Sequence, residues 1–197
     1  VRVMAQGTKR IMIAGVGGQG ILLVSRILSN GLIKAGYDVK SSEVHGMAQR
    51  GGSVVTQLSF GEKVYSPIIG AGAVDLLITL EKLEALRYVH FLKKNGTLLM
   101  NEREIPSLPI LTGAVEYPTD IKEQLAKYPV SLYSIDADKE AEKLGNLRVM
   151  NVVLLGAMVK LAGLADLVDW SAVVAEEVKP AYRDVNIKAF SVGTNLV

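Results

Sequence analysis

The hydrophobic positions of the chain follow two periods, and the changes between them mark the expected elements. Residues 9–15, "KRIMIAG", form a short apolar run ending in glycine, which predicts a buried strand. Residues 19–36 repeat apolar side chains every three or four positions, which predicts a helix that ends at Gly36. Residues 37–44 then predict a second strand. The expected inward stripe of the helix comprises Ile21, Leu22, Ser25, Leu28, Leu32 and Ala35.

Residues 53–60, "SVVTQLSF", alternate strictly and predict a strand with Val54, Thr56, Leu58 and Phe60 on one face. The "GEK" that follows predicts a turn. This part of the chain therefore departs from a simple strand–helix–strand alternation, and we expect it to be antiparallel or to lie at the sheet edge.

The alternation then resumes along the rest of the chain. Further strands are expected at 73–80, 97–102 and 130–136, and helices at 81–94 (closed by Asn95-Gly96), 119–128, 137–145, from 146 onward and at about 169–179. Residues 103–118 carry three prolines and predict a loop-rich crossover. The fold class is therefore α/β: a Rossmann-like, doubly wound, mostly parallel sheet with an antiparallel excursion and C-terminal helices. No repeat or composition break divides residues 1–197, so one domain is expected.

Composition narrows the classes of function. The 197 residues include 49% hydrophobic ones, enough for one sizeable core, and the net charge of +2 is spread along the chain. No basic block is interleaved with aromatics, so neither nucleic acid nor a membrane is expected as a partner. The longest apolar run, 152–159, is too short for a membrane span, and residues 1–10 lack a signal-peptide core. We expect a soluble, cytoplasmic protein.

Cysteine is absent and histidine occurs only at 45 and 90. The absence of cysteine excludes disulfides, a catalytic thiol and a Cys-held iron–sulfur cluster in this polypeptide. Two histidines make a multi-histidine metal site improbable. We therefore expect no metal ligands and no electron carrier in this chain.

The segment "GVGGQG" at 15–20 fits the pattern G-x-G-x-x-G, after a predicted strand and before a predicted helix. Such a turn lets a backbone approach a pyrophosphate and presents the helix N-terminus to an anion. The alternative is that the glycines only allow the helix to pack closely on the sheet. Both interpretations stay open on the residues alone.

An NAD-dependent dehydrogenase is the first functional alternative. Glu43 lies near the end of the second strand, where an acidic residue binds the ribose hydroxyls, although it comes later than usual. No Tyr-x-x-x-Lys pair occurs, and no residue offers itself for the proton transfer that accompanies hydride transfer. His90 lies within a predicted amphipathic helix, which favours packing or solvent contact. Glu81 and Glu84 most simply place negative charge near a helix N-terminus.

The stretch "SSEVHGMAQRGG" at 41–52 combines an acid, a histidine, a methionine, an arginine and three glycines. Together with "GVGGQGI" at 15–21 it resembles the gamma-type subunit or domain of 2-oxoacid:ferredoxin oxidoreductases. The segment "EVHGMAQRGG" at 43–52 is similar to the beta subunit of the indolepyruvate type in particular. Matching stretches at 65–101, 151–163 and 186–193 extend the resemblance over almost the whole chain, whereas residues 103–145 carry little of it.

The resemblance implies a gamma-type pyruvate/ketoisovalerate oxidoreductase domain with no established nicotinamide role. In that family the holoenzyme decarboxylates a 2-oxoacid on thiamine diphosphate, reduces ferredoxin through iron–sulfur clusters and forms acyl-coenzyme A. The thiamine site and the clusters belong to the alpha subunit, which agrees with the missing cysteines. The indolepyruvate type acts on aryl pyruvates, and pyruvate, 2-oxoisovalerate or 2-oxoglutarate are the alternative substrates. The resemblance therefore implies an essential partner subunit, inactive alone, that contacts the alpha subunit and, through the complex, ferredoxin.

We expect the glycine turn and the 43–52 loop to face the alpha subunit and to help shape the entrance for substrate or coenzyme A. Arg50 would pair with a carboxylate or phosphate, His45 would donate a hydrogen bond, Glu43 would orient one of them, and Met47 would give apolar contact. The alternative is that Glu43 pairs with Arg50, His45 caps a helix and Met47 fills the core. No catalytic residue is assigned. The candidate binding set comprises Gly15, Gly17, Gly18, Gln19, Gly20, Glu43, His45, Gly46, Met47, Gln49, Arg50, Gly51 and Gly52.

Asn151 stands in an otherwise apolar helix, and a buried amide needs partners. We expect it to tether the 41–52 loop or another backbone segment. Besides the oxidoreductase subunit and the free-standing dehydrogenase, a ligand-sensing module on the same fold is a third alternative. A homodimer that buries the partner-binding face is a further expectation for the isolated chain.

Overall fold

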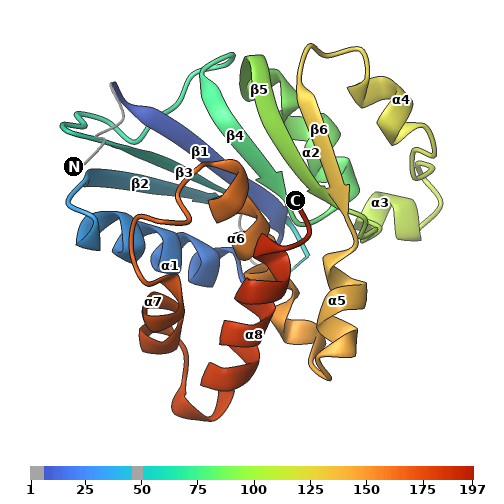
Figure 1. The fold of residues 1–197 in the computed structure, drawn as a ribbon. Coiled ribbons are helices and arrows are strands. Elements are labelled where there is room, and N and C mark those ends of the chain that lie inside the picture. The colour runs from blue at the N-terminus through green and yellow to red at the C-terminus, as the bar shows by residue number, and fades with distance from the viewer. Residues whose placement is uncertain (1–6, 46–50) are drawn as a thin grey trace.

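The computed structural model describes residues 7–45 and 51–197, and these fold into one layered α/β arrangement (Figure 1). The strands are β1 (Lys9–Val16), β2 (Asp38–His45), β3 (Ser53–Gly61), β4 (Val74–Thr79), β5 (Leu92–Asn101) and β6 (Ser131–Ile135). The α-helices are α1 (Ile21–Lys34), α2 (Lys82–Tyr88), α3 (Leu108–Leu111), α4 (Ile121–Leu125), α5 (Ala137–Lys143), α6 (Met150–Leu161), α7 (Trp170–Glu177) and α8 (Arg183–Thr194). Three 3-10 turns, η1 (Val89–Phe91), η2 (Leu147–Val149) and η3 (Pro180–Tyr182), complete the elements of the described chain.

The described strands form a six-stranded sheet in the order β2-β3-β1-β4-β5-β6. Strand β3 pairs antiparallel with both β2 and β1, whereas β1, β4, β5 and β6 are parallel. The predicted α/β class and antiparallel excursion are confirmed. The alternative of a sheet-edge position for residues 53–60 is wrong, because β3 lies between β2 and β1. Its residues are buried on both faces: Leu58 belongs to the larger core and Val55 to the smaller one.

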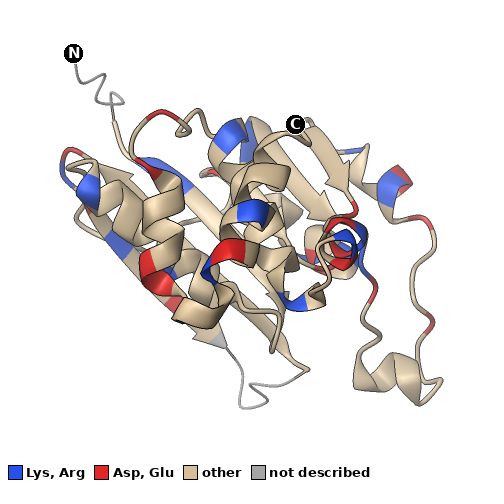
Figure 2. Ribbon diagram, turned by 60° about the horizontal axis from the view of Figure 1, so that its bottom comes forward, with Lys and Arg blue, Asp and Glu red and all other residues tan. Residues whose placement is uncertain are grey.

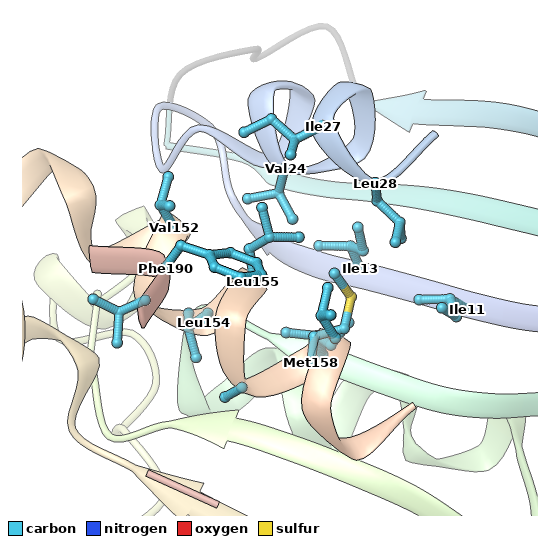
Figure 3. Close-up of a cluster of buried hydrophobic side chains, with 14 of the residues drawn as sticks. Ile11, Ile13, Val24, Ile27, Leu28, Val152, Leu154, Leu155, Met158 and Phe190 are labelled. Carbon is cyan, nitrogen blue, oxygen red and sulfur yellow. The ribbon is translucent and has the colours of Figure 1, made fainter. Parts of the chain in front are cut away.

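Two helical layers cover the sheet, as Figure 1 shows. Helices α1, α6, α7 and α8 pack on one face, where the larger core forms. In that core, Ile11 and Ile13 of β1 meet side chains from α1 and α6, such as Leu28 and Leu155 (Figure 3). Helices α2 and α4 cover the other face over a smaller cluster around Met12, Leu77 and Leu98. Burial of these aliphatic side chains is the main favourable term for the fold.

The predicted helix over 81–94 is wrong at its end. Helix α2 ends at Tyr88, a 3-10 turn follows, and residues 92–95 already belong to β5. Asn95 has φ 61, and the register between β4 and β5 shifts here, between Val74 and Leu76. The Asn-Gly pair that predicted a helix stop therefore forms a bulge at the start of a strand.

Helix α1 follows the predicted stripe with one exception. Ile21, Ser25, Leu28 and Leu32 are buried, and Gly36 takes φ 92 directly after the helix, as expected for a terminating glycine. Leu22, however, is 49% exposed. The buried stripe instead includes Val24 and Ile27, so the inward face is centred away from Leu22, which is left at the surface beside the glycine turn.

Helices α6 and α8 cross in close backbone contact, and glycine makes this possible. A Cβ added to Gly156 would lie 2.1 Å from the Phe190 carbonyl oxygen, and one added to Gly193 would lie 1.9 Å from the Val153 carbonyl oxygen. Real Cβ atoms do not come so near to backbone, so both positions need glycine. The crossing fixes α6, and α6 in turn brings Asn151 to the glycine turn.

Charged residues are spread over the described surface, with lysine and arginine intermingled with aspartate and glutamate (Figure 2). Within the described ranges, no helix has the length and apolar character needed to cross a bilayer.

Candidate functional site

The glycine turn lies at the carboxyl end of β1, beside the carboxyl ends of β4 and β5, where α/β folds place their sites. Gly15 and Gly20 serve packing. A Cβ at Gly15 would lie 3.0 Å from the Leu80 Cβ, and one at Gly20, which has φ 81 at the N-cap of α1, would lie 2.3 Å from the Asn151 Nδ2. These two glycines therefore hold the turn against β4 and α6.

Gln19 is turned into the protein. Its Oε1 accepts the Val16 N–H (2.7 Å), and its Nε2 donates to the Leu80 carbonyl (2.9 Å). The side chain thereby joins the ends of β1 and β4. Both functional atoms of the Gln19 amide thus have backbone partners, and the ligand contact expected of Gln19 stays a prediction.

The outward part of the turn is formed by Gly17 and Gly18. Gly18 has φ 102, and among the described residues no atom outside its neighbours lies within 4 Å of an added Cβ. The Gly17 N–H donates to the Gly52 carbonyl (2.8 Å), and the Gly51 N–H donates to the Gly17 carbonyl (3.3 Å). The two glycine segments, 15–20 and 51–52, are thus one bonded unit, which we call the glycine edge.

Two hollows flank the glycine edge. The first, of about 460 Å³, lies between the turn, the first residues of α1 and the end of β2, with Arg26, Glu43 and exposed Leu22 in its wall. The second, of about 610 Å³, lies on the other side, between the turn, Gly51 and the start of α6. Arg103 and Arg148 line this second hollow, so its charge favours an anion.

The described structure includes only part of the predicted 41–52 stretch. Glu43 is exposed near the end of β2 and borders the first hollow. The backbone of His45 ends β2. The side chain of His45, and Gly46, Met47, Gln49 and Arg50, lie outside the described residues, so their roles and the pairing of Glu43 with Arg50 stay predictions.

The position of β3 bears on the nicotinamide alternative. In a dinucleotide-binding fold the acidic residue stands on the strand next to β1. Here β3 lies between β1 and β2, so Glu43 is two strand spacings, about 10 Å, from β1. This displacement weakens the case for ribose recognition by Glu43.

Asn101, Asp138 and Arg103 form a polar network that sequence reasoning missed. Asn101, fully buried at the end of β5, donates to the Leu80 carbonyl (3.2 Å) and to Asp138 (2.8 Å) and accepts the Ala137 N–H (2.9 Å). Asp138 in turn pairs with Arg103 (2.6 Å). The only signal in the sequence is the run of polar residues that follows the apolar strand. The network sets the guanidinium of Arg103 at the second hollow.

Glu81 and Glu84 are both buried, at 1% and 3% exposure. Glu81 accepts the Glu84 N–H (3.0 Å) and so caps α2, which confirms the predicted place at a helix N-terminus; it also accepts from the Tyr117 hydroxyl (2.6 Å) and the Ile105 N–H (3.2 Å). Burial, followed by the hydrogen bond to Glu81, raises the pKa of Tyr117. Glu81 therefore ties the 103–118 crossover to the strand ends.

Glu84 anchors the start of β3 to α2. It accepts a hydrogen bond from Ser53, whose hydroxyl also lies 3.1 Å from that of Tyr88, and it pairs with Arg87 at 3.1 Å. Burial raises the pKa of Glu84 above its usual range. Because Ser53 directly follows Gly52, this contact fixes the chain as it leaves the glycine edge.

Asn151 is tethered as expected, to another backbone segment: its Nδ2 donates to the Gly20 carbonyl (3.1 Å). Its Oδ1 is buried and has no hydrogen-bond partner among the described residues. His90 lies exposed on η1 with its ring 4.5 Å from that of Phe91, which confirms packing and solvent contact. In the described ranges, no group of three His, Asp or Glu side chains is placed to hold a metal ion.

The fold and the glycine edge define a Rossmann-like α/β domain whose glycine turn is bonded to a second glycine pair. The family model described as pyruvate ferredoxin/flavodoxin oxidoreductase matches residues 10–196. The chain therefore belongs to this family.

Named relatives narrow the position within the family. The chain is 40% identical to the indolepyruvate oxidoreductase subunit IorB of Pyrococcus horikoshii over 187 residues, 93% of each chain. It is 36% identical to the same subunit of Archaeoglobus fulgidus, over 94% of this chain and 93% of that one. It is a gamma-type small subunit of a 2-oxoacid oxidoreductase, of the indolepyruvate kind, and takes part in an enzyme complex.

Solved structures have the same fold. The gamma subunit of the keto/oxoacid ferredoxin oxidoreductase of Geobacter sulfurreducens superposes with a TM-score of 0.72 at 24% identity, over 95% of this chain and 97% of that one. The 2-oxoglutarate:ferredoxin oxidoreductase of Magnetococcus marinus, described with 2-oxoglutarate, coenzyme A and succinyl-CoA bound, superposes with a TM-score of 0.70 at 18% identity. That match covers 97% of this chain and 31% of the longer one.

Replacing Gln19 by Ala should lower the free energy of unfolding by about 2 kcal/mol, because the buried Val16 N–H loses its acceptor. Chemical denaturation measures the change. Gln124→Ala is the matched control, since Gln124 bonds only to Asp120 at the surface, and it should cost less than about 0.5 kcal/mol. Equal losses for the two variants would contradict the role given to Gln19.

Replacing Glu84 by Gln should change how stability depends on pH. The pKa of Glu84 is raised in the folded protein above the ordinary 4.5, so folding takes up a proton between these two values. Acidification through that window therefore stabilises the wild type relative to the variant, which has no proton to take up. Unfolding free energies measured from neutral pH down to about 4.5 should show the difference moving in favour of the wild type; a constant difference, or one of opposite sign, would rule this out.

Proposed function

We propose that the glycine edge docks on the alpha subunit beside the thiamine site of that partner and helps to complete its active site. The observation that carries the proposal is the bonded unit of Gly17, Gly51 and Gly52, which brings the two specific sequence motifs of the chain to one place. The buried ties of Gln19 and Asn101 support it, because they make that unit a fixed surface instead of a free loop.

Contact with coenzyme A is the second part of the proposal. No atom of the described residues beyond its neighbours lies against the outer side of Gly18, and the first N–H groups of α1 have no acceptor within the helix. The second hollow adds the guanidinium groups of Arg103 and Arg148, a donor set that suits phosphate or carboxylate. These residues fit the anionic part of coenzyme A, and the binding of coenzyme A by the Magnetococcus marinus enzyme supports the assignment.

The 43–52 loop has roles that rest on its residue types. Arg50 pairs with a carboxylate or phosphate, His45 donates a hydrogen bond, Glu43 orients one of them, and Met47 offers apolar contact. Gly46, Gln49, Gly51 and Gly52 complete the loop, and the last two allow close approach of a backbone. Glu43, which lines the first hollow together with Gly17 and Gly18, supports a role of this stretch at the glycine edge.

The reaction proposed for the complex is the oxidative decarboxylation of aryl pyruvates to acyl-coenzyme A with reduction of ferredoxin. Thiamine diphosphate and the iron–sulfur clusters belong to the alpha subunit, and they supply the carbanion chemistry and the electron transfer. Residues 1–197 act as one gamma-type domain that positions and encloses the reactants. A cytoplasmic location, and a homodimer of the isolated chain, stay predictions.

Co-expression with the alpha subunit tests the proposal. The complex should reduce a ferredoxin substitute in a reaction that needs both indolepyruvate and coenzyme A, while the alpha subunit alone should not. Arg50→Ala should lower kcat/KM for coenzyme A by about tenfold to a hundredfold, as expected for a lost charged contact. Arg10→Ala is the control, because Arg10 lies at the opposite, amino end of β1.

Three outcomes would contradict the proposal. The first is tight NAD(H) binding by the chain alone together with no stable partner, which would restore the dehydrogenase alternative. The second is full activity of the Arg50→Ala complex, which would remove the 43–52 loop from the site. The third is an equal loss in the Arg10→Ala complex, which would make the effect one of folding.

A further inference from the structure

A pocket of about 460 Å³ lies at the amino ends of the strands, on the edge of the sheet opposite to the glycine edge. Lys9 begins β1, Asp75 is the second residue of β4, and Lys93 is the second residue of β5. The length of β1 separates this amino-edge pocket from the glycine turn by roughly 25 Å. The pocket is therefore distinct from the two hollows described above.

The floor of the amino-edge pocket is apolar. Ile11 and Leu76 are register partners on β1 and β4 and lie on the face that α6 covers. Figure 3 shows Ile11 nearer the amino end of β1 than Ile13 and farther from Val152 and Leu155 of α6. Phe60, packed edge-on against Tyr37 with ring centroids 5.4 Å apart, closes one end. This floor can contact an aromatic or branched aliphatic body.

The outer wall is the connection from α6 to α7, and it is held in place. Gly163 turns the chain with φ 68, and the Leu164 N–H donates back to the Val159 carbonyl (2.9 Å). The Trp170 indole N–H donates to the Leu164 carbonyl (2.8 Å). The pocket is thus bounded by a tied turn, as is usual for preformed small-molecule sites.

The rim carries an excess of positive charge. Of the described lining residues, only Lys9, Lys93 and Asp75 are charged, which leaves one positive charge in excess. The Asp75 carboxylate is occupied, since it accepts the Arg10 N–H (2.8 Å) and pairs with Lys93, while the Lys9 ammonium is 3.9 Å away. Both lysine side chains are nearly half exposed, at 46% and 45%, so each can turn toward a ligand.

We infer that the amino-edge pocket binds a small apolar monocarboxylate, with its aryl or branched aliphatic part on the Ile11–Leu76 floor and its carboxylate at Lys9 and Lys93. Thr97 of β5 also lines the pocket and adds a hydroxyl to the polar end. The volume is large enough for a ligand of this size, and the charge favours a monoanion over a neutral or cationic analogue. This binding site does not depend on the function proposed for the glycine edge.

Titration of the full chain with phenylacetate and with 4-methylpentanoate, followed by amide chemical shifts and by calorimetry, tests the inference. We expect saturable binding with Kd below about 10 mM and shifts at Ile11, Leu76 and Leu164 but not at residues 17–20. Neutral phenylacetamide and cationic phenethylamine should bind at least about tenfold more weakly, because they lack the carboxylate. The same titration of the chain within its complex should give the same shifts.

Two kinds of variant separate charge from shape. Lys9→Gln/Lys93→Gln should weaken phenylacetate binding about tenfold or more, whereas Lys94→Gln, a neighbouring exposed lysine outside the pocket, should leave it within about twofold. If the double variant does not fold, Lys9→Gln alone gives the charge test. Ala162→Phe should abolish binding by filling the pocket from its wall. Absence of saturable binding, equal affinity for acid and amide, or shifts confined to the glycine edge would overturn the inference.

Discussion

The glycine edge depends on one part-buried side-chain amide. Gln19 accepts from the Val16 N–H and donates to the Leu80 carbonyl, so the ends of β1 and β4 are held together by the turn that leaves β1. The same carbonyl accepts from Asn101 at the end of β5. Three neighbouring parallel strands thus end in one hydrogen-bonded row. Unpaired polar groups there would each cost about 1–3 kcal/mol, which favours a single arrangement of the turn.

This hydrogen-bonded row determines which backbone groups of the glycine turn face outward. With the inner side of the turn fixed by Gln19, Gly18 faces outward and Gly17 is free to pair with the Gly51–Gly52 segment. From the other side, Asn151 holds the Gly20 carbonyl, and it reaches this place because α6 and α8 cross closely at their glycines. The core packing of the C-terminal helices and the geometry of the glycine edge are therefore parts of one structure, and the function proposed for that edge rests on this geometry.

The sequence predicted the fold class because burial periodicity is a local signal: the strand–helix alternation, the antiparallel direction of residues 53–60 and the tether from Asn151 all follow from it. It missed what depends on partners distant in the chain. An Asn-Gly pair such as Asn95-Gly96 is equally compatible with the end of a helix and with a bulge in a strand. The bulge forms here because β5 pairs with β4. The sequence did not predict the backbone hydrogen bonds of Gln19, since their partners lie across the turn and 61 residues away. The residue types of the 41–52 stretch drew attention to a site, but Glu84, Asp138 and Arg148 join that region only through folding.

The central claim is that the glycine edge is the face that meets the partner subunit. Hydrogen–deuterium exchange of the chain alone and in complex with the alpha subunit measures it directly. Amides of residues 17–23 and 51–54 should gain protection in the complex, while those of residues 61–66, at the opposite end of β3, should exchange as in the free chain. Unchanged exchange at the glycine edge, with new protection confined to the amino ends of the strands, would contradict the account.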